Sequence, residues 1–358
     1  PPPAPTPAPT PLTVTSTNVT TSTAGGPAVL TVTGTGLDST LDVTSSTCTN
    51  IVRSAASTST TALYQCTTTD YTGSIVVSSA AGTALSTATF AIPAPSVTSS
   101  SVSATRYGAP VLLTLTGANL DAGISVTAPG CKGLTLSTTA PNASSATTAY
   151  YTCTASGAFN SSFTVKGAFG EALGSATLTV PVPIVTMAVS GDGVSGDLVF
   201  TLRGDKAPTT VDNFLAYVNS GFYAGTIFHR VVPNFVVQAG GYTSATSGTL
   251  GTPKTATYAP IPLEVTGGSN VQWTAAMART SAPASATSQF FINLVDNSSF
   301  LDASQASPGY AVFGDVTASA SLVQAIVAAP HCTALTGISD GSCVPIPNIV
   351  ITSATQTQ

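Results

Sequence analysis

The fold of the C-terminal half is decided by residues 228–238, FHRVVPNFVVQ. Valine and aromatic residues, which favour strands, make up most of this stretch. Arg230 and Gln238 have the same parity, so on a regular strand their side chains would face the same side. The stretch thus combines a guanidinium group, the ring of Phe235 and an amide in one strand-forming segment.

Two further motifs follow this stretch, and each has two parts. Residues 277–280, MART, are followed by residues 288–293, SQFFIN, and residues 300–302, FLD, by residues 309–314, GYAVFG. Three motifs in this order, spread over about 85 residues, form a specific pattern. They closely resemble the cyclophilin family of peptidyl-prolyl isomerases, in the form found in bacteria. The resemblance covers residues 184–358.

The resemblance implies a mainly β fold for this half, an eight-stranded antiparallel barrel capped by two helices. The residues themselves predict strands over 184–190 and 196–202. They also predict a helix over 207–218, because apolar residues recur on one face and Pro208 stands in the first turn. A second amphipathic segment over 320–328 is the other expected helix.

Rotation about an X-Pro amide is slow, because resonance creates a barrier of about 18–20 kcal/mol. A catalyst needs a pocket for the prolyl ring, anchors for the flanking backbone and a hydrogen-bond donor aimed at the prolyl nitrogen. Such a donor localises the lone pair of the nitrogen and stabilises the twisted state. The reaction requires no cofactor and no metal, so neither is expected here.

The resemblance implies roles for ten residues of this chain. Arg230 is the donor to the prolyl nitrogen, and an arginine keeps its charge at any working pH. Gln238 holds the substrate carbonyl and helps to orient Arg230, and Phe235 completes the catalytic set as part of the proline pocket. The substrate-binding residues that it implies are Val236, Ala278, Arg279, Gln289, Phe291, Leu301 and Tyr310.

Other ionisable residues have simpler interpretations. His229 has the opposite parity to Arg230, so we expect a buried structural histidine and not a base. His331 is expected to face solvent in a loop. The aspartates of the same half resemble turn residues more than calcium ligands. These are Asp192, Asp197 and Asp205.

The N-terminal half contains an internal repeat. Residues 30–38, LTVTGTGLD, match residues 113–121, LTLTGANLD. Apolar and Thr/Ser residues alternate over short runs, which is typical of half-buried antiparallel strands, and units of about 85–90 residues suit small β-sandwiches. The two units, 12–94 and 95–183, resemble immunoglobulin-like modules of bacterial surface proteins. Neither contains a cluster of His, Asp, Glu or Cys for chemistry, so we expect spacers or binding modules.

Six cysteines form three neighbouring couples. None has the short C-x-x-C spacing of a zinc or redox site. Fifteen pairings are possible, but a couple recurs at the same place in both repeats, which favours pairing within couples. Six buried thiols are the alternative, whereas disulfides would indicate an oxidising compartment. The couples are Cys48 with Cys66, Cys131 with Cys153, and Cys332 with Cys343.

Composition restricts the partners and the location. Only 6% of the residues are charged and the net charge is -5, so nucleic acid is not an expected partner. There is no run of about 20 apolar residues, and no transmembrane segment is predicted. The sequence starts at Pro1, with neither methionine nor signal peptide, which suggests a processed protein. We therefore expect a secreted bacterial protein in the periplasm, at the cell surface or outside the cell.

The sequence thus predicts a secreted or cell-surface isomerase that acts on X-Pro bonds of peptides or proteins. The alternative is a structural or adhesive protein that uses the isomerase groove for binding. Residues 1–11, PPPAPTPAPTP, favour a polyproline II conformation. They could dock on the groove of a neighbouring copy, which would give a homopolymer in the form of a head-to-tail filament. Strand addition to a neighbouring sandwich and a plain spacer to an anchor are the other interpretations of this segment.

Overall fold

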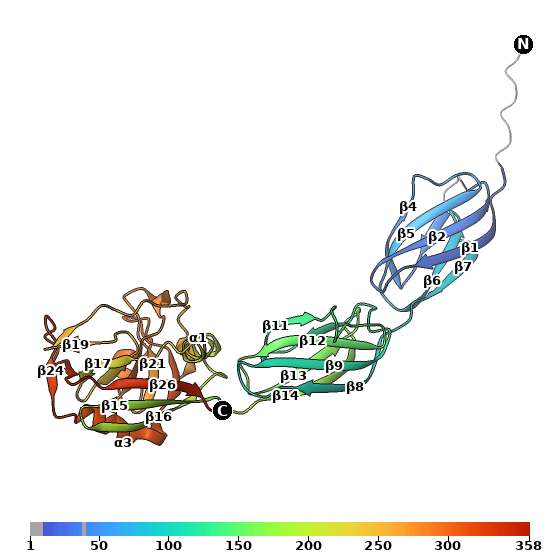
Figure 1. Ribbon diagram of the computed structural model, residues 1–358. Coiled ribbons are helices and arrows are strands. Elements are labelled where there is room, and N and C mark those ends of the chain that lie inside the picture. Colours follow the sequence, from blue (N-terminus) through green and yellow to red (C-terminus); the bar gives the residue numbers. More distant parts are fainter. Residues whose placement is uncertain (1–9, 38–40) are drawn as a thin grey trace, which may run out of the picture.

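Three groups of β-sheets follow one another along the chain (Figure 1). This computed structural model describes residues 10–37 and 41–358. Residues 1–9 lie outside the described residues, and so does the expected docking of the proline-rich segment. The chain is mainly β, as predicted. None of the helices in the described part is long and apolar enough to cross a membrane.

The first two groups share one strand order. Each contains a four-stranded and a three-stranded antiparallel sheet: β1-β2-β5-β4 with β3-β6-β7 in the first, and β8-β9-β12-β11 with β10-β13-β14 in the second. The strands of the first are β1 (Thr13–Thr21), β2 (Pro27–Thr35), β3 (Leu41–Thr44), β4 (Cys48–Arg53), β5 (Thr61–Thr68), β6 (Thr72–Ser79) and β7 (Ala84–Ala91). Those of the second are β8 (Ser96–Ser103), β9 (Pro110–Ala118), β10 (Ser125–Thr127), β11 (Cys131–Leu136), β12 (Thr148–Ala155), β13 (Asn160–Lys166) and β14 (Ala172–Thr179).

Alternation of apolar and polar residues produces these strands. In β2, Leu30 and Val32 are fully buried, and so are the matching residues of β9, Leu113 and Leu115. Successive side chains of a strand point to opposite faces, so each sheet has one apolar face to bury. The two groups are therefore compatible with the predicted β-sandwiches, and we call them the first and the second sandwich.

Three disulfides join the predicted couples and confirm the pairing. They are Cys48–Cys66, Cys131–Cys153 and Cys332–Cys343. The first two connect neighbouring strands of a four-stranded sheet, β4 to β5 and β11 to β12. Each therefore ties an edge strand to its neighbour and, on the chain-entropy model, contributes about 3 kcal/mol to stability.

The third group is a closed antiparallel barrel. Eight strands follow one another in the order β18-β22-β21-β23-β16-β15-β26-β17, and pairing of β17 with β18 closes the ring. This confirms the predicted eight-stranded barrel. The strands are β15 (Ile184–Gly191), β16 (Val194–Leu202), β17 (Thr226–Val232), β18 (Val236–Ala239), β21 (Thr274–Met277), β22 (Phe290–Asn293), β23 (Val312–Asp315) and β26 (Val350–Gln356).

Shorter strands lie outside the ring. The hairpin of β24 (Cys332–Ala334) and β25 (Cys343–Pro345) extends the sheet from β17. A separate small hairpin consists of β19 (Ala245–Thr246) and β20 (Thr249–Leu250).

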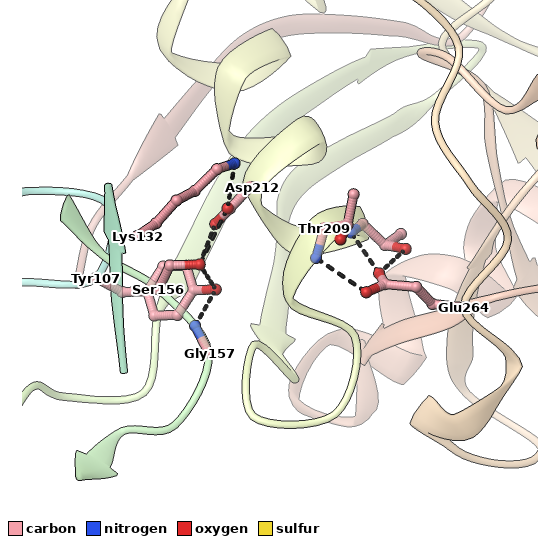
Figure 2. Close-up of polar contacts among 8 residues, drawn as sticks. Tyr107, Lys132, Ser156, Gly157, Thr209, Asp212 and Glu264 are labelled. Atoms are coloured by element: carbon pink, nitrogen blue, oxygen red, sulfur yellow. Dashed lines mark hydrogen bonds and ion pairs between the residues drawn. The ribbon is translucent and has the colours of Figure 1, made fainter. Parts of the chain in front are cut away.

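Both predicted helices are present, as α1 (Pro208–Asn219) and α3 (Ala320–Val327). The N-cap of α1 is an alanine without a capping oxygen. The carboxylate of Glu264 takes that role, because it accepts hydrogen bonds from the backbone N–H groups of Thr209 at 3.1 Å and Thr210 at 2.7 Å (Figure 2). The shorter elements are α2 (Ser298–Leu301), η1 (Val265–Gly267), η2 (Pro283–Ser285) and η3 (Thr317–Ser319).

The second sandwich docks on the barrel beside α1 (Figure 2). Tyr107 is fully buried, and its hydroxyl accepts the N–H of Gly157 at 3.0 Å. The hydroxyl of Ser156 donates to the carboxylate of Asp212 in α1 at 3.0 Å, and Lys132 pairs with the same carboxylate at 3.1 Å. One buried apolar cluster runs from this sandwich into the barrel, whereas the first sandwich has a cluster of its own.

Candidate active site

The seam where the barrel closes carries the two polar residues of the expected site. Arg230 lies on β17 and Gln238 on β18, and the two are directly opposite in the antiparallel register. The tight turn between these strands is possible because Asn234 adopts a positive φ of 59°, a conformation that asparagine tolerates. The turn also presents Phe235 beside Arg230.

Nine of the ten expected site residues line one cavity of about 200 Å³. This volume lies below the roughly 300–1,000 Å³ of sites for drug-sized ligands, so the cavity suits a single side chain or ring. The nine residues are Arg230, Phe235, Val236, Gln238, Ala278, Arg279, Phe291, Leu301 and Tyr310.

The floor of the cavity is apolar. Val236, Phe291 and Leu301 are buried and belong to one small apolar cluster. The rings of Phe291 and Tyr310 meet edge to face at 5.5 Å, an arrangement that aromatic pairs favour. A proline ring seated on this floor would lose its contact with water without leaving a polar group unpaired.

A second guanidinium, that of Arg279, is held firmly at the side of the cavity. Its Nε donates to the carbonyl of Gly309 at 2.8 Å and its Nη1 to the carbonyl of Thr280 at 2.9 Å. It also stacks over the ring of Tyr310 at 4.4 Å, within the range of a cation–π contact. The main chain at this position is therefore well anchored at the edge of the cavity.

Gln289, the tenth expected residue, borders an adjoining hollow of about 160 Å³ together with Gln238. The side-chain amide of Gln238 donates to Oε1 of Gln289 at 2.9 Å. Within the described residues, the hydrogen bonds of the Arg230 side chain go to Ser342 and Asp340. Gln238 was expected to orient Arg230, but Ser342 and Asp340 make that contact instead.

A buried asparagine network supports the cavity from below. Asn293 donates to Asn270 at 3.2 Å, and Asn297 donates to Asn293 at 2.9 Å and to the carbonyl of Phe235 at 2.8 Å. Asn270 donates in turn to the carbonyl of Leu301 at 3.1 Å. The network therefore holds the backbone of two residues that line the cavity. Sequence analysis missed these asparagines, and the only sign of them was that Asn293 ends the SQFFIN motif.

Asp302 completes this network. Burial alone would raise the pKa of Asp302, but hydrogen bonds from Ser269 and from Asn270 outweigh burial and keep the pKa below its usual value. The carboxylate is therefore charged at neutral pH and can act as a permanent acceptor for the backbone N–H of Asn270, at 2.7 Å.

The two histidines take no part in the cavity. His229 is buried, and burial lowers its pKa to about 4, so the ring is neutral at neutral pH. His331 is exposed and pairs with Asp192 at 2.6 Å. In the part of the chain that the structure describes, no group of three or more His, Cys, Asp or Glu residues could hold a metal ion.

Comparison with known proteins agrees with this geometry. Residues 184–356 match the family model of the cyclophilin type peptidyl-prolyl cis-trans isomerase, which runs from β15 to β26. The chain is 48% identical over 139 residues to a peptidyl-prolyl cis-trans isomerase of Acinetobacter baylyi, covering 38% of this chain and 70% of that protein.

Two further relatives are similar. The chain is 46% identical over 165 residues to the peptidyl-prolyl cis-trans isomerase cyp18 of Streptomyces antibioticus, covering 45% of this chain and 92% of that protein. It is 46% identical over 134 residues to the peptidyl-prolyl cis-trans isomerase B of Escherichia coli, covering 37% of this chain and 78% of that protein.

Proposed function

This chain belongs to the cyclophilin family of peptidyl-prolyl cis-trans isomerases, and we propose that catalysis in its barrel depends on Arg230. One observation supports this assignment above the others: a single cavity unites a guanidinium, an amide and an apolar floor. Proline-containing peptides or proteins are the substrates that this family membership implies.

The proposed mechanism needs no covalent step. The prolyl ring enters the apolar cavity over Phe291 and Leu301, while Gln238 and the main chain near Arg279 hold the flanking backbone. Arg230 donates an N–H to the prolyl nitrogen as the amide twists and its lone pair becomes available. Because that lone pair is delocalised in the planar amide, the donor stabilises the transition state more than the ground state. Lowering the barrier by about 5–7 kcal/mol would accelerate exchange by about 10⁴–10⁵.

Replacement of Arg230 by alanine tests the assignment. Loss of one donor aimed at the transition state costs about 10²–10³ in rate, so kcat/KM for an Ala-Pro peptide should fall by that factor. Arg106→Ala is the matched control, because this exposed arginine lies in the second sandwich, away from the cavity. Full activity of Arg230→Ala, with the fold intact, would refute the role of this residue.

We also propose the organisation of the rest of the chain. Its units are a proline-rich segment (1–11), two immunoglobulin-like spacers (12–94 and 95–183) and the isomerase domain (184–358). The three disulfides are consistent with an extracellular or periplasmic protein. A bacterial protein displayed at the cell surface or secreted, with the sandwiches holding the isomerase away from an attachment point, accounts for both features.

A second candidate is a structural or adhesive role. It is supported by the elongated arrangement in Figure 1, in which the first sandwich and the barrel lie at opposite ends of the described chain. If residues 1–11 of one copy occupied the isomerase cavity of the next, the contact would be heterologous and would propagate as a filament. The low content of charged residues, 6%, leaves little repulsion between copies.

Electron microscopy of protein with and without residues 1–11 tests this candidate. Docking predicts filaments that disappear on removal of the segment and also on addition of excess Ala-Pro peptide. Strand addition to a neighbouring sandwich predicts loss on removal but not on addition of peptide. Assembly that is unchanged after removal would rule out both.

A further inference from the structure

A loop closed by a disulfide reaches the guanidinium of Arg230. The loop, residues 335–342, connects β24 to β25, and the Cys332–Cys343 disulfide joins these two strands. In the pairing of β25 with β17, Cys343 lies opposite the residue that follows Arg230. The first residue of the loop is buried in a small apolar cluster. The loop is therefore fixed at both ends beside the catalytic strand.

Two side chains of this loop contact one edge of the guanidinium. Nε of Arg230 donates to Oγ of Ser342 at 3.0 Å, and Nη2 donates to Oδ2 of Asp340 at 2.7 Å. The other carboxylate oxygen of Asp340 accepts the backbone N–H of Ser342 at 2.9 Å and also its hydroxyl. Asp340 and Ser342 are thus held together by hydrogen bonds that do not involve the arginine.

We propose that Asp340 and Ser342 are positioning residues for catalysis: they hold the Nε–Nη2 edge of Arg230 so that its remaining N–H groups are directed to the substrate. This inference rests on the proposed role of Arg230. A guanidinium has five N–H donors in a fixed plane. Two are used by the loop, which leaves three for the substrate.

The contact of Asp340 and Ser342 with Arg230 can orient the guanidinium but contributes little to the stability of the fold. The side chain of Asp340 is 44% exposed and that of Arg230 22%, and ion pairs of this kind contribute little to folding. Two bonds on one edge, however, fix both the rotamer and the plane of a long side chain. The entropy of ordering Arg230 is therefore lost during folding, before the substrate binds.

The carboxylate is available as an acceptor at every pH used for assays. Hydrogen bonds from Ser342 and Arg230 lower the pKa of Asp340 to about 2. The amide of Gln238, which could have filled this role, is bonded to Gln289 instead. The loop is thus the part of the described chain that holds the Arg230 side chain by hydrogen bonds.

The alternative is that the contact between Asp340 and Arg230 inhibits catalysis. If Asp340 withheld the guanidinium from the substrate, its removal would increase the rate. If Asp340 positions the guanidinium, its removal lets the side chain sample other rotamers and slows the twisting step. Binding of the prolyl ring on the apolar floor does not use this pair, so KM should change little while kcat falls.

Asp340→Ala and Ser342→Ala, measured by NMR exchange of an Ala-Pro peptide, test the proposal. We expect kcat to fall about 10- to 100-fold for Asp340→Ala and less for Ser342→Ala, each with KM within about twofold. The control is Asp205→Ala, which removes an exposed aspartate 3.8 Å from Lys206 and should leave kcat unchanged. In NMR spectra, the Nε–H signal of Arg230 should be protected from solvent exchange in the wild type and lose that protection in both loop variants.

Arg230→Ala separates failure of this inference from failure of the proposed function. In the Arg230→Ala background, Asp340→Ala should cause no further loss, because the two residues act as one unit. Unchanged or increased kcat in Asp340→Ala, alongside a large loss in Arg230→Ala, would overturn the positioning role alone. Equal losses from Asp340→Ala in both backgrounds, or an unaltered Nε–H signal, would also overturn it.

Discussion

The two joints of this chain are built differently. Between the sandwiches, the hydroxyl of Tyr71 donates to Glu171 at 2.5 Å and its ring meets Phe169 at 4.8 Å, and Tyr71 remains partly exposed. Between the second sandwich and the barrel, Tyr107 is fully buried, and Gln356 of β26 donates to its carbonyl at 3.0 Å.

The cores show the same difference. The apolar cluster of the first sandwich is separate, whereas one cluster joins the second sandwich to the barrel. Unfolding either part would expose the shared core and lose its free energy, so the second sandwich and the barrel should behave as one cooperative unit. The first sandwich, attached mainly through one tyrosine, should unfold on its own. The shared core therefore fixes the barrel relative to the second sandwich.

The largest expected effect comes from removing the buried tyrosine. Tyr107→Ala should lower the free energy of unfolding of the joint unit by about 3–5 kcal/mol, as for other large buried aromatics. Calorimetry should show one transition for the sandwich–barrel unit of the wild type and two in the variant. Tyr71→Ala, the same change at the other joint, should leave that transition in place. Equal effects of the two variants would contradict the difference between the joints.

The next largest effect is a loss of stability at high pH through ionisation of Tyr107. Burial is the main cause that raises its pKa from 10.0 to about 12, so between these values the unfolded chain has already lost a proton that the folded chain keeps. The stability from this group is fully present below pH 10 and is lost as the pH rises to 12, by about 2–3 kcal/mol. Urea unfolding at pH 9 and pH 12 should show a smaller loss for Tyr107→Phe than for the wild type. The same loss in both proteins would exclude this linkage.

Gly204 should be the most sensitive glycine at this joint. A Cβ there would lie 2.6 Å from the ring of Tyr107, so Gly204→Ala should destabilise the joint unit by about 1–3 kcal/mol through overpacking. The control is Gly174→Ala, where the nearest atoms to a Cβ are at 3.8 Å. Thermal unfolding of both variants measures the difference, and tolerance of Gly204→Ala would show that the joint can open.

The smallest effect is expected at the rim of the joint. The side chain of Lys132 is 67% exposed in its pair with Asp212, so Lys132→Ala should cost less than about 1 kcal/mol. The hydroxyl of Ser156 still holds Asp212 in that variant. Lys166→Ala, at an exposed position on β13, is the control. A loss as large as that of Tyr107→Ala would mean that charge and not burial couples the two parts.

Several features could be predicted because they depend on residues close in sequence. The motifs that resemble those of cyclophilins predicted that Arg230, Phe235 and Phe291 share one site, and the spacing of apolar residues predicted α1 within a residue or two. The repeat predicted the pairing of Cys48 with Cys66 and of Cys131 with Cys153. In these cases the signal is a local pattern of apolar, glycine or cysteine residues. Such a pattern directly determines which side chains share one face of a strand or a helix.

Other features could not be predicted because single polar residues in loops have no periodic signal. Glu264 caps α1 from a distant segment, and the asparagine network joins two loop residues, Asn270 and Asn297, to Asn293 at the end of β22. Such contacts depend on the path of the loops after the barrel has closed. An aspartate in a polar loop, such as Asp340, resembles any other turn residue in the sequence.

The sequence by itself determined the cysteine couples through their spacing and the repeat, and its resemblance to cyclophilins determined the barrel and the apolar floor of the cavity, because motifs and spacing lie along the chain. Only the tertiary structure decided that Asp340 and Ser342, and not Gln238, hold Arg230. It also decided that Tyr107 joins a sandwich to the barrel. The physical reason is the same for both: a hydrogen bond or a buried ring between distant residues exists only once the packed elements have brought their atoms within contact distance.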